Sequence, residues 1–310
     1  MNELPKLFWI VCSIIVGCSY SCKDQAQKST PAATTSTTHT KLSANHGYNF
    51  ASPSSTLNLS ADLAEISGLA YDTVSGMLIG VNDELGNIYH INKYDGRTVN
   101  IEKFGKKGDY EGLATNADIT YVLKSNGNVY AYNRATTATT KYKTGLTASQ
   151  DAEGLLLLDD GNLLIACKGN KKTGAKSVKN IYLYNISQEA LSEKPIIAIH
   201  DSTLTALVDH QQAASKAMKR MLQKRAKEFS PSAIAQEPNT GRYYVLSARG
   251  STIVLCTEQK VEDIIFLNER QQPQPEGICF DTDHNLYIAN EGRGLGARIF
   301  VYQPIYQAGQ

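Results

Sequence analysis

The sequence predicts an all-β fold, a five-bladed β-propeller of four-stranded antiparallel blades with one inserted α-helix. Three observations support this prediction. A motif led by an acidic residue or serine recurs along the chain, most recurrences lie 42–46 residues apart, and short strands with an alternating apolar pattern fill the intervals. A period in the forties with four short strands per unit is typical of a propeller blade.

The repeated motif begins at five positions that we take as equivalent. In the first unit, strands are expected at residues 66–72, 77–83, 87–93 and 98–104, with turn-forming Gly, Asn and Asp residues between first and second strands. The final unit ends after three strands, so residues 55–60 are expected to supply its fourth strand and close the ring. The five motif positions are Glu65, Glu111, Glu153, Ser232 and Glu276, at spacings of 46, 42, 79 and 44 residues.

The long interval of 79 residues predicts a helical insertion rather than a sixth blade. Residues 196–200 already supply the fourth strand of the third blade, and residues from about 202 to 229 carry apolar side chains at helical period. A basic amphipathic helix can bind a membrane surface or a partner, or it can pack on its own domain with its charges in solvent. The polar face of this helix holds Lys216, Lys219, Arg220, Lys224, Arg225 and Lys227.

The N-terminal 47 residues predict an export signal, an anchor and a tether. Lys6 is followed by an apolar run over residues 7–17, which is too short to span a bilayer and typical of a secretory signal. The run ends at Cys18 in a sequence that resembles a bacterial lipobox. We therefore expect a signal peptide at 1–17 and lipidation of Cys18, with Cys22 as the alternative. A plain cleaved signal without lipid stays open.

Residues 18–47 are rich in Ser, Thr and Ala and are expected to form a flexible tether before a propeller at 48–310. This organisation predicts an exported protein, anchored to the membrane through an N-terminal lipid in the cell envelope, on its periplasmic or outer membrane face. The formal charge of +1 gives no reason to expect a nucleic-acid partner.

The recurring glutamates predict a metal site. First strands line the channel of a propeller, so Glu65, Glu111, Glu153 and Glu276 would converge there, and converging carboxylates need a compensating cation. Calcium takes six to eight oxygen ligands and suits this set. The alternative is a structural latch, in which each glutamate pairs with a backbone N–H or a lysine. Further oxygens are expected from the ends of the second strands, at Asn82, Asp83, Asn290 and Glu291.

Five segments, taken together, resemble the SdiA-regulated family of YjiK/CarP type. They are EISGLAYD…VNDE, DYEGLA, DAEGL, FSPSAIAQEPNTGRYYVLSA and QPEGICFDTDHNLYIANEG, and they cover roughly residues 54–302. The resemblance implies a five-bladed propeller distantly related to NHL repeats, with a calcium site in its channel. It also implies an exported protein associated with a membrane.

These features favour a calcium-binding propeller that serves as a binding or scaffold module. The alternative is a calcium-dependent hydrolase, lactonase-like or phytase-like, in which the cation would polarise the substrate. Such an enzyme would need an acid–base partner, and His90, His200, His210 and His284 do not fall at repeated channel positions. A third possibility is an interaction platform that holds an unknown small ligand or protein on one propeller face.

Overall fold

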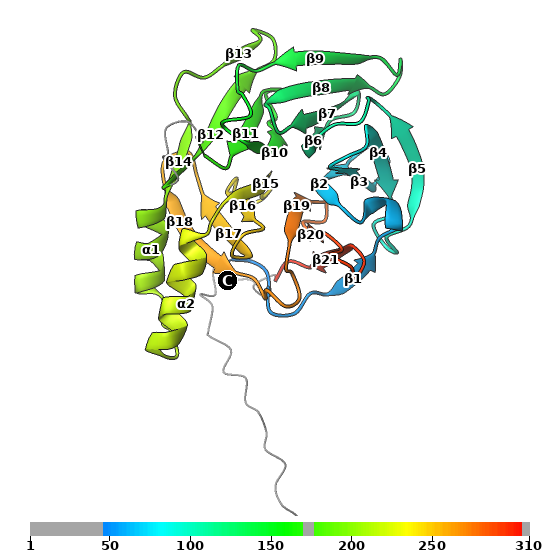
Figure 1. Cartoon of the computed structure of the whole chain (residues 1–310). Coiled ribbons are helices and arrows are strands. Elements are labelled where there is room, and N and C mark those ends of the chain that lie inside the picture. The colour runs from blue at the N-terminus through cyan, green and yellow to red at the C-terminus, as the bar shows by residue number, and fades with distance from the viewer. Residues whose placement is uncertain (1–45, 170–176, 306–310) are drawn as a thin grey trace, which may run out of the picture. The chain divides into compact units, whose positions relative to one another are not determined.

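The fold, a computed structural model, is described for residues 46–169 and 177–305. Five antiparallel sheets are arranged around a central axis, as Figure 1 shows, and this confirms the predicted five-bladed propeller. Blade 1 consists of β2 (Ile66–Asp72), β3 (Met77–Asn82), β4 (Asn87–Ile91) and β5 (Thr98–Lys103). Blade 2 consists of β6 (Tyr110–Thr115), β7 (Ile119–Lys124), β8 (Asn128–Asn133) and β9 (Thr139–Lys143).

The other blades follow the same plan with local additions. Blade 3 consists of β10 (Ala152–Leu157), β11 (Leu163–Cys167), β12 (Val178–Asn185) and β14 (Ile197–His200), with a two-residue strand β13 (Ala190–Leu191) also paired to β12. Blade 4 consists of β15 (Pro231–Gln236), β16 (Tyr243–Ser247), β17 (Thr252–Cys256) and β18 (Val261–Phe266). Blade 5 consists of β19 (Pro275–Phe280), β20 (Leu286–Asn290), β21 (Arg298–Tyr302) and β1 (Ser55–Asn58).

The ring is closed by the strand that the sequence predicts. β1 pairs antiparallel with β21, with Ser55 opposite Val301 and Asn58 opposite Arg298. This pairing puts the start and the end of the propeller in the same blade, which closes the ring. Buried apolar side chains between neighbouring blades form the core, and Cys167, Cys256 and Cys279 are free and buried within it.

Buried ion pairs join blade 1 to both of its neighbours. Arg134, just after β8, lies 2.6 Å from the carboxylate of Asp72 at the end of β2. Lys93, just after β4, lies 2.9 Å from the carboxylate of Asp281 that follows β19. Both carboxylates also accept backbone N–H groups of their own hairpin turns. The pairs therefore fix the turn and the neighbouring blade together.

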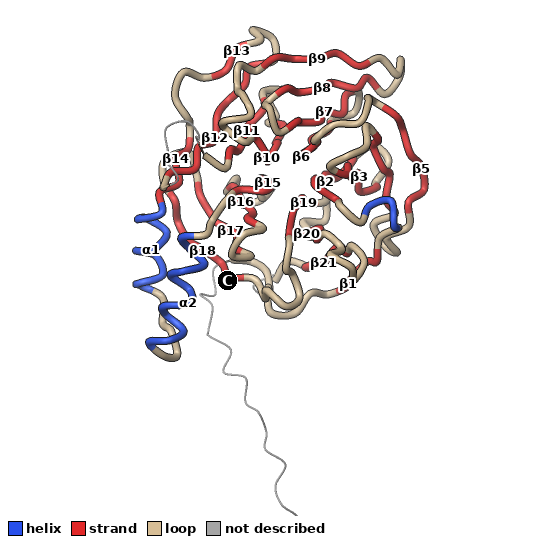
Figure 2. The backbone as a smooth tube through the Cα atoms, in the orientation of Figure 1, coloured by secondary structure: helices blue, strands red, loops and turns tan. Residues whose placement is uncertain are grey.

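The helical insertion differs from its prediction. The prediction of one helix over about 202–229 was wrong, because the segment forms two helices, α1 (Asp201–His210) and α2 (Lys216–Lys227), on the outside of the ring (Figure 2). Gln211 leaves α1 in an extended conformation and donates its side-chain amide to the Ile264 carbonyl oxygen. Ser215 then accepts the Met218 N–H and caps a new helix.

The described part of the chain starts at the propeller itself. His46 is 9% exposed, and its Nε2 lies 3.2 Å from a carboxylate oxygen of Asp263 in β18, so the chain contacts blade 4 just before the expected start of the propeller at residue 48. The predicted signal peptide, Cys18, Cys22 and tether residues 18–45 lie outside the described residues. Within residues 46–169 and 177–305, no helix is long and apolar enough to cross a membrane.

Candidate functional site at the acidic channel mouth

The first strand of every blade carries a β-bulge near its start. The pairing register with the second strand shifts between Tyr110 and Gly112 in blade 2, and at the matching place in the other four blades. A bulge redirects the side chain of the extra residue. The five bulge residues are Ser67, Glu111, Glu153, Ser232 and Glu276.

The alignment of Glu65 with the other glutamates was wrong by two residues. Glu65 is exposed and precedes β2, whereas Ser67 occupies the bulge in blade 1. The carbonyl oxygen of Glu65 accepts the N–H of Asp83, and in blades 2 and 3 the carbonyl oxygens of Asp109 and Asp151 accept the corresponding bonds. Glu65 therefore belongs with these two aspartates, and the expected ring of four glutamates consists of three glutamates and two serines.

The glycine after the bulge lets neighbouring first strands approach closely. A Cβ on Gly112 would lie 2.7 Å from the backbone oxygen of Glu153, and one on Gly277 would lie 2.7 Å from Cβ of Leu69. Neither backbone position has room for a side chain. The glycines thus bring the bulge residues of adjacent blades together around the axis.

Among the described residues, Lys168 is the cation that contacts a bulge glutamate. It follows β11, and its Nζ lies 2.6 Å from Oε1 of Glu153, a side chain that is 5% exposed. Burial raises the pKa of Glu153 to about 7, although the Lys168 ammonium acts in the opposite direction. Burial pulls the pKa of Lys168 down, but Glu153, Glu276 and Glu111 outweigh it and hold that pKa above its ordinary value. The latch alternative is therefore realised at Glu153.

The other two bulge glutamates, Glu111 and Glu276, form no ion pair with a lysine of the described residues, and their pKa values are raised as well. Burial, followed by the negative charge of Glu153, raises the pKa of Glu111 to about 9. Burial also raises the pKa of Glu276 to about 7, where Lys168 lowers it and Glu291 and Glu111 raise it. Lys168 thus acts on three poorly solvated carboxyl groups. Ionising all three at once is strongly unfavourable, because a single ammonium group cannot balance them.

A second acidic group lies where blade 5 meets blade 1. Burial and the charge of Glu65 raise the pKa of Asp83 to about 6, and Glu84 and Asp109 add to the effect. The pKa of Glu291 is raised mainly by burial; the cation of Arg293 opposes this rise, and the charge of Asp83 adds to it. Glu65, Asp83 and Glu291 therefore sense one another electrostatically.

Two side-chain oxygens in this region lack partners. Oδ1 of Asp83 and Oδ1 of Asn290 are buried and make no hydrogen bond within the described part of the chain. Asn82 differs, because its amide donates to the Asp62 carbonyl oxygen and accepts the Leu85 N–H. We call the whole region the acidic mouth. It comprises Glu65, Asp83, Asp109, Glu111, Asp151, Glu153, Glu276 and Glu291, together with Lys168.

The acidic mouth supplies carboxylate and amide oxygens, the donor type that calcium prefers. As the side chains stand, however, no three or more His, Cys, Asp and Glu side chains of residues 46–169 and 177–305 are grouped so that they could hold a metal ion. Binding at Asp83 would thus require nearby carboxylates to turn toward it. Glu65 is exposed and has the freedom to do so.

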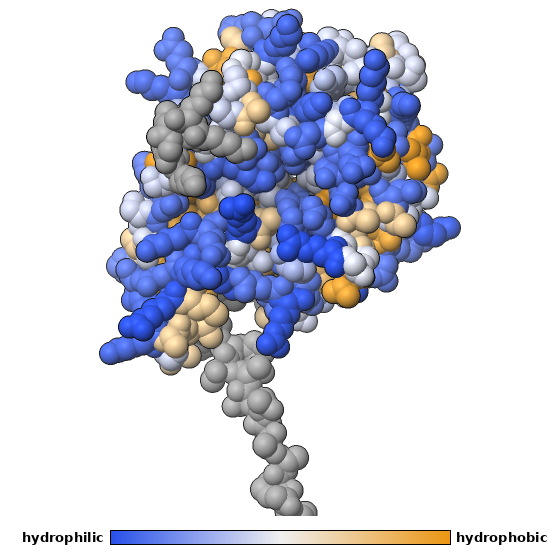
Figure 3. Space-filling model, viewed as in Figure 1, coloured by the Kyte–Doolittle hydropathy of each residue, from blue (hydrophilic) through white to orange (hydrophobic). Residues whose placement is uncertain are grey.

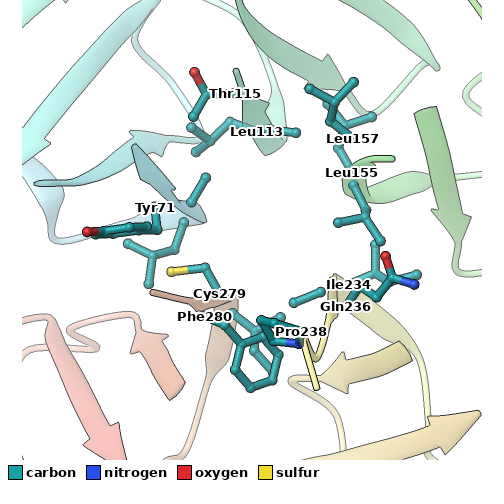
Figure 4. Close-up of a pocket in the computed structure, with 16 residues that line it drawn as sticks. Tyr71, Leu113, Thr115, Leu155, Leu157, Ile234, Gln236, Pro238, Cys279 and Phe280 are labelled. Carbon is teal, nitrogen blue, oxygen red and sulfur yellow. The ribbon is translucent and has the colours of Figure 1, made fainter. Parts of the chain in front are cut away.

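The channel changes character along the same five strands. Beyond the bulges, their side chains line a cavity of about 160 Å³, which Figure 4 shows in close-up. Leucine, alanine and isoleucine are the commonest residues in its wall, while Tyr71, Thr115 and Gln236 bring polar atoms to it. The acidic mouth and this apolar cavity therefore occupy successive levels of the first strands.

The histidines considered for catalysis are found on other elements. His90 lies in β4 with Nε2 3.5 Å from Glu102, and His284 lies in the turn between β19 and β20. His200 and His210 lie at the two ends of α1.

Sequence reasoning missed Lys168, Ser67, Asp109 and Asp151. Lys168 had a signal, because it follows a second strand at the same place as Asp83 and Glu291. Each of the three donates its N–H to the carbonyl oxygen of the residue two places before the bulge residue of its own blade. An alignment of second-strand ends would have found it.

Comparisons with known proteins support the family resemblance and the fold. The SdiA-regulated family model matches residues 184–293, from the end of β12 to just past β20, which confirms the resemblance over that range. The chain is similar in structure to glutaminyl cyclase of Myxococcus xanthus, with 14% identity, a TM-score of 0.54, and 83% of this chain and 97% of that chain covered. It is also similar to the PQQ-bound aldose sugar dehydrogenase of Streptomyces coelicolor, with 12% identity, a TM-score of 0.49, and coverage of 81% and 97%. No curated protein matches the sequence. The structural likenesses concern the fold alone.

Proposed function

We propose that this propeller is a lipid-anchored, calcium-binding module that serves as a binding or scaffold protein in the bacterial cell envelope. The observation that carries the proposal is the acidic mouth, where eight carboxyl groups gather and Lys168 is the lysine of the described residues that acts on three of them. A divalent cation would lower the cost of keeping these groups ionised at neutral pH.

Calcium is proposed to bind on the side of the mouth at Asp83. Glu153 already has the Lys168 ammonium, and Asn82 uses both ends of its amide within the loop. Glu65, Asp83 and Glu291 have no lysine among them, and Asp83 and Asn290 each offer a buried oxygen without a hydrogen bond in the described residues. Glu111 and Glu276 would respond through the shared electrostatic field.

Calcium is expected to raise the melting temperature of the propeller by about 5–10 °C at one hundred times its dissociation constant. The variant Asp83→Asn/Glu291→Gln should lose most of this shift, because it removes two charged donors. Exposed Asp118→Asn/Glu193→Gln provides a control with the same change of charge. Differential scanning calorimetry measures the shift, and elemental mass spectrometry identifies any metal that copurifies. Equal shifts in both variants would place calcium elsewhere.

The lipid anchor is proposed from the sequence around Cys18. Replacement of Cys18 by serine should move the protein from the membrane fraction to the soluble fraction of cells, while Cys22→Ser should leave it membrane-bound. The opposite pattern would assign the lipid to Cys22. Fractionation after metabolic labelling with an alkyne fatty acid reads both location and acylation. Labelling that persists in the double variant would refute this anchor.

One observation favours a hydrolase as the second candidate. Glu153 and Glu276 have pKa values of about 7, which suits a general base at neutral pH. Turnover of lactone, aryl ester or phosphate ester substrates that requires calcium and fails in Glu276→Gln would favour the enzyme over the binding module. A small ligand held by the apolar cavity without turnover would favour the interaction platform.

A further inference from the structure

The exposed cations of α2 form a single stripe. Lys216, Arg220, Lys224 and Lys227 are all exposed and follow one another at intervals of four, four and three residues, so they share one face of the helix. In Figure 3, strongly hydrophilic side chains project at the lower left, where Figure 1 places the two helices. We call these four residues the cationic stripe.

The two other cations of α2 have structural partners. Arg225 is 8% exposed and donates to the carbonyl oxygens of Gly250, Ser251 and Leu267, which fastens α2 to blade 4. Lys219 lies 3.0 Å from Asp209 of α1. The fold therefore separates cations that hold the hairpin from cations that point into solvent.

Few acidic groups neutralise the cationic stripe. Lys224 lies 3.6 Å from Glu228 on the same helix, an exposed pair of the kind that contributes little. The charge of Lys227 acts on Asp201 at the start of α1. Exposed Met221, at 43%, lies one residue from Arg220 and adds an apolar group to the same region.

The chain enters the propeller beside this helical hairpin. His46 contacts Asp263 of β18, and Gln211 of the α1–α2 connection donates to the same carboxylate. The proposed lipid site at Cys18 precedes His46 by 28 residues. If residues 18–47 form the flexible tether that the sequence predicts, a chain of that length has an average end-to-end distance of about 30 Å, and an anchored propeller would stay within reach of the bilayer on the side of its helices.

We infer that the cationic stripe of α2 docks the anchored propeller onto an anionic lipid surface. The inference rests on the proposed lipid anchor, which would hold the propeller near the bilayer. The attraction to anionic lipids comes from the cationic stripe and does not depend on the anchor. Each cation near an anionic membrane strengthens binding by about fivefold. Four cations bind weakly alone, but a tether supplies an effective concentration in the millimolar range and makes weak contact sufficient.

The test uses residues 39–310, a compact unit that holds every described element and lacks both candidate lipidation cysteines. Cosedimentation is measured with vesicles of phosphatidylcholine alone and with 40% phosphatidylglycerol. We expect binding only to the anionic vesicles, weakening at least tenfold between 0.05 and 0.3 M salt. The variant Lys216→Gln/Arg220→Gln/Lys224→Gln/Lys227→Gln should bind at least thirtyfold more weakly.

The matched control changes four exposed lysines on blades 1 and 2, in the variant Lys103→Gln/Lys106→Gln/Lys107→Gln/Lys143→Gln, and should retain most of the binding. Circular dichroism confirms that both variants are folded. Equal losses of binding in the two variants would mean that only the net charge matters and would contradict a specific role of the stripe. The inference would also be overturned if the unmodified unit did not bind anionic vesicles. Because this unit lacks the lipid, neither result depends on whether Cys18 is acylated.

Discussion

Replacing Lys168 by methionine is expected to destabilise the propeller by about 3 kcal/mol at pH 8, more than any surface substitution. The ammonium lies 2.6 Å from the Glu153 carboxylate, and that side chain is almost fully buried. Methionine keeps much of the side-chain volume and removes the charge, so Glu153, Glu111 and Glu276 would lose the Lys168 ammonium that acts on all three. Urea denaturation at pH 8 measures the loss.

Two comparisons separate this electrostatic cause from lost packing. At pH 5, Glu153 is protonated in the folded protein, since its pKa is about 7, and Lys168→Met should cost much less there. In a Glu153→Gln background, Lys168→Met should also cost little, because the carboxylate that needs the ammonium is absent. A cost that is unchanged in both comparisons would mean that Lys168 acts through its packing alone.

The fold could be predicted from the sequence because each level of the pattern agrees with the others. The period sets the number of blades, the turn residues separate the strands, and the four strands of blade 1 lie within a residue or two of their predicted bounds. The missing fourth strand of the last blade implied that the chain closes on itself, and β1 pairs with β21 accordingly. Consistency of this kind is typical of sequences that specify one fold.

The site could be predicted only in part, for two physical reasons. A β-bulge inserts one residue into the alternation, so the pattern does not distinguish Glu65 from Ser67 as the residue that enters the channel. Lys168 comes from a second strand and reaches Glu153 only after the blade has folded. The spacing of first strands therefore located the acidic mouth but gave neither its register nor its cation.

The sequence predicted where the helical insertion lies but not that it consists of two helices, because the apolar residues keep a helical period across the end of α1 and the start of α2. Residues 211–215 contain no Gly or Pro that would announce a turn. The break instead follows from tertiary contacts of Gln211 with β18 and from the cap at Ser215. These contacts also bring the hairpin next to the point where the chain enters the propeller.

In the absence of calcium, the free energy of unfolding is expected to fall as the pH rises from 5 to 8. Glu276 has a folded-state pKa of about 7 and an ordinary value of 4.5. Between these values the folded protein binds more protons than the unfolded chain, so raising the pH favours unfolding. The difference between the two pKa values of Glu276 corresponds to about 3 kcal/mol of unfolding free energy. Glu153, whose pKa is also raised to about 7, changes the stability in the same direction. Urea denaturation at intervals of one pH unit, in chelator, measures the slope.

Glu276→Gln mimics the protonated carboxyl group and makes this expectation specific. The variant should match the unmodified protein at pH 5 and exceed its stability at pH 8 by as much as 3 kcal/mol, with a smaller slope between. Glu193→Gln, at an exposed site, should reproduce the slope of the unmodified protein. Stability that is flat from pH 5 to 8, or equal slopes in both variants, would mean that Glu276 ionises as an ordinary solvated glutamate. Added calcium should raise the stability of the unmodified protein most at high pH and so reduce the slope, because a divalent cation favours the ionised carboxylates. Lys168 is the only lysine among the described groups that act on Glu276, so the calcium ion would add to a small positive charge there.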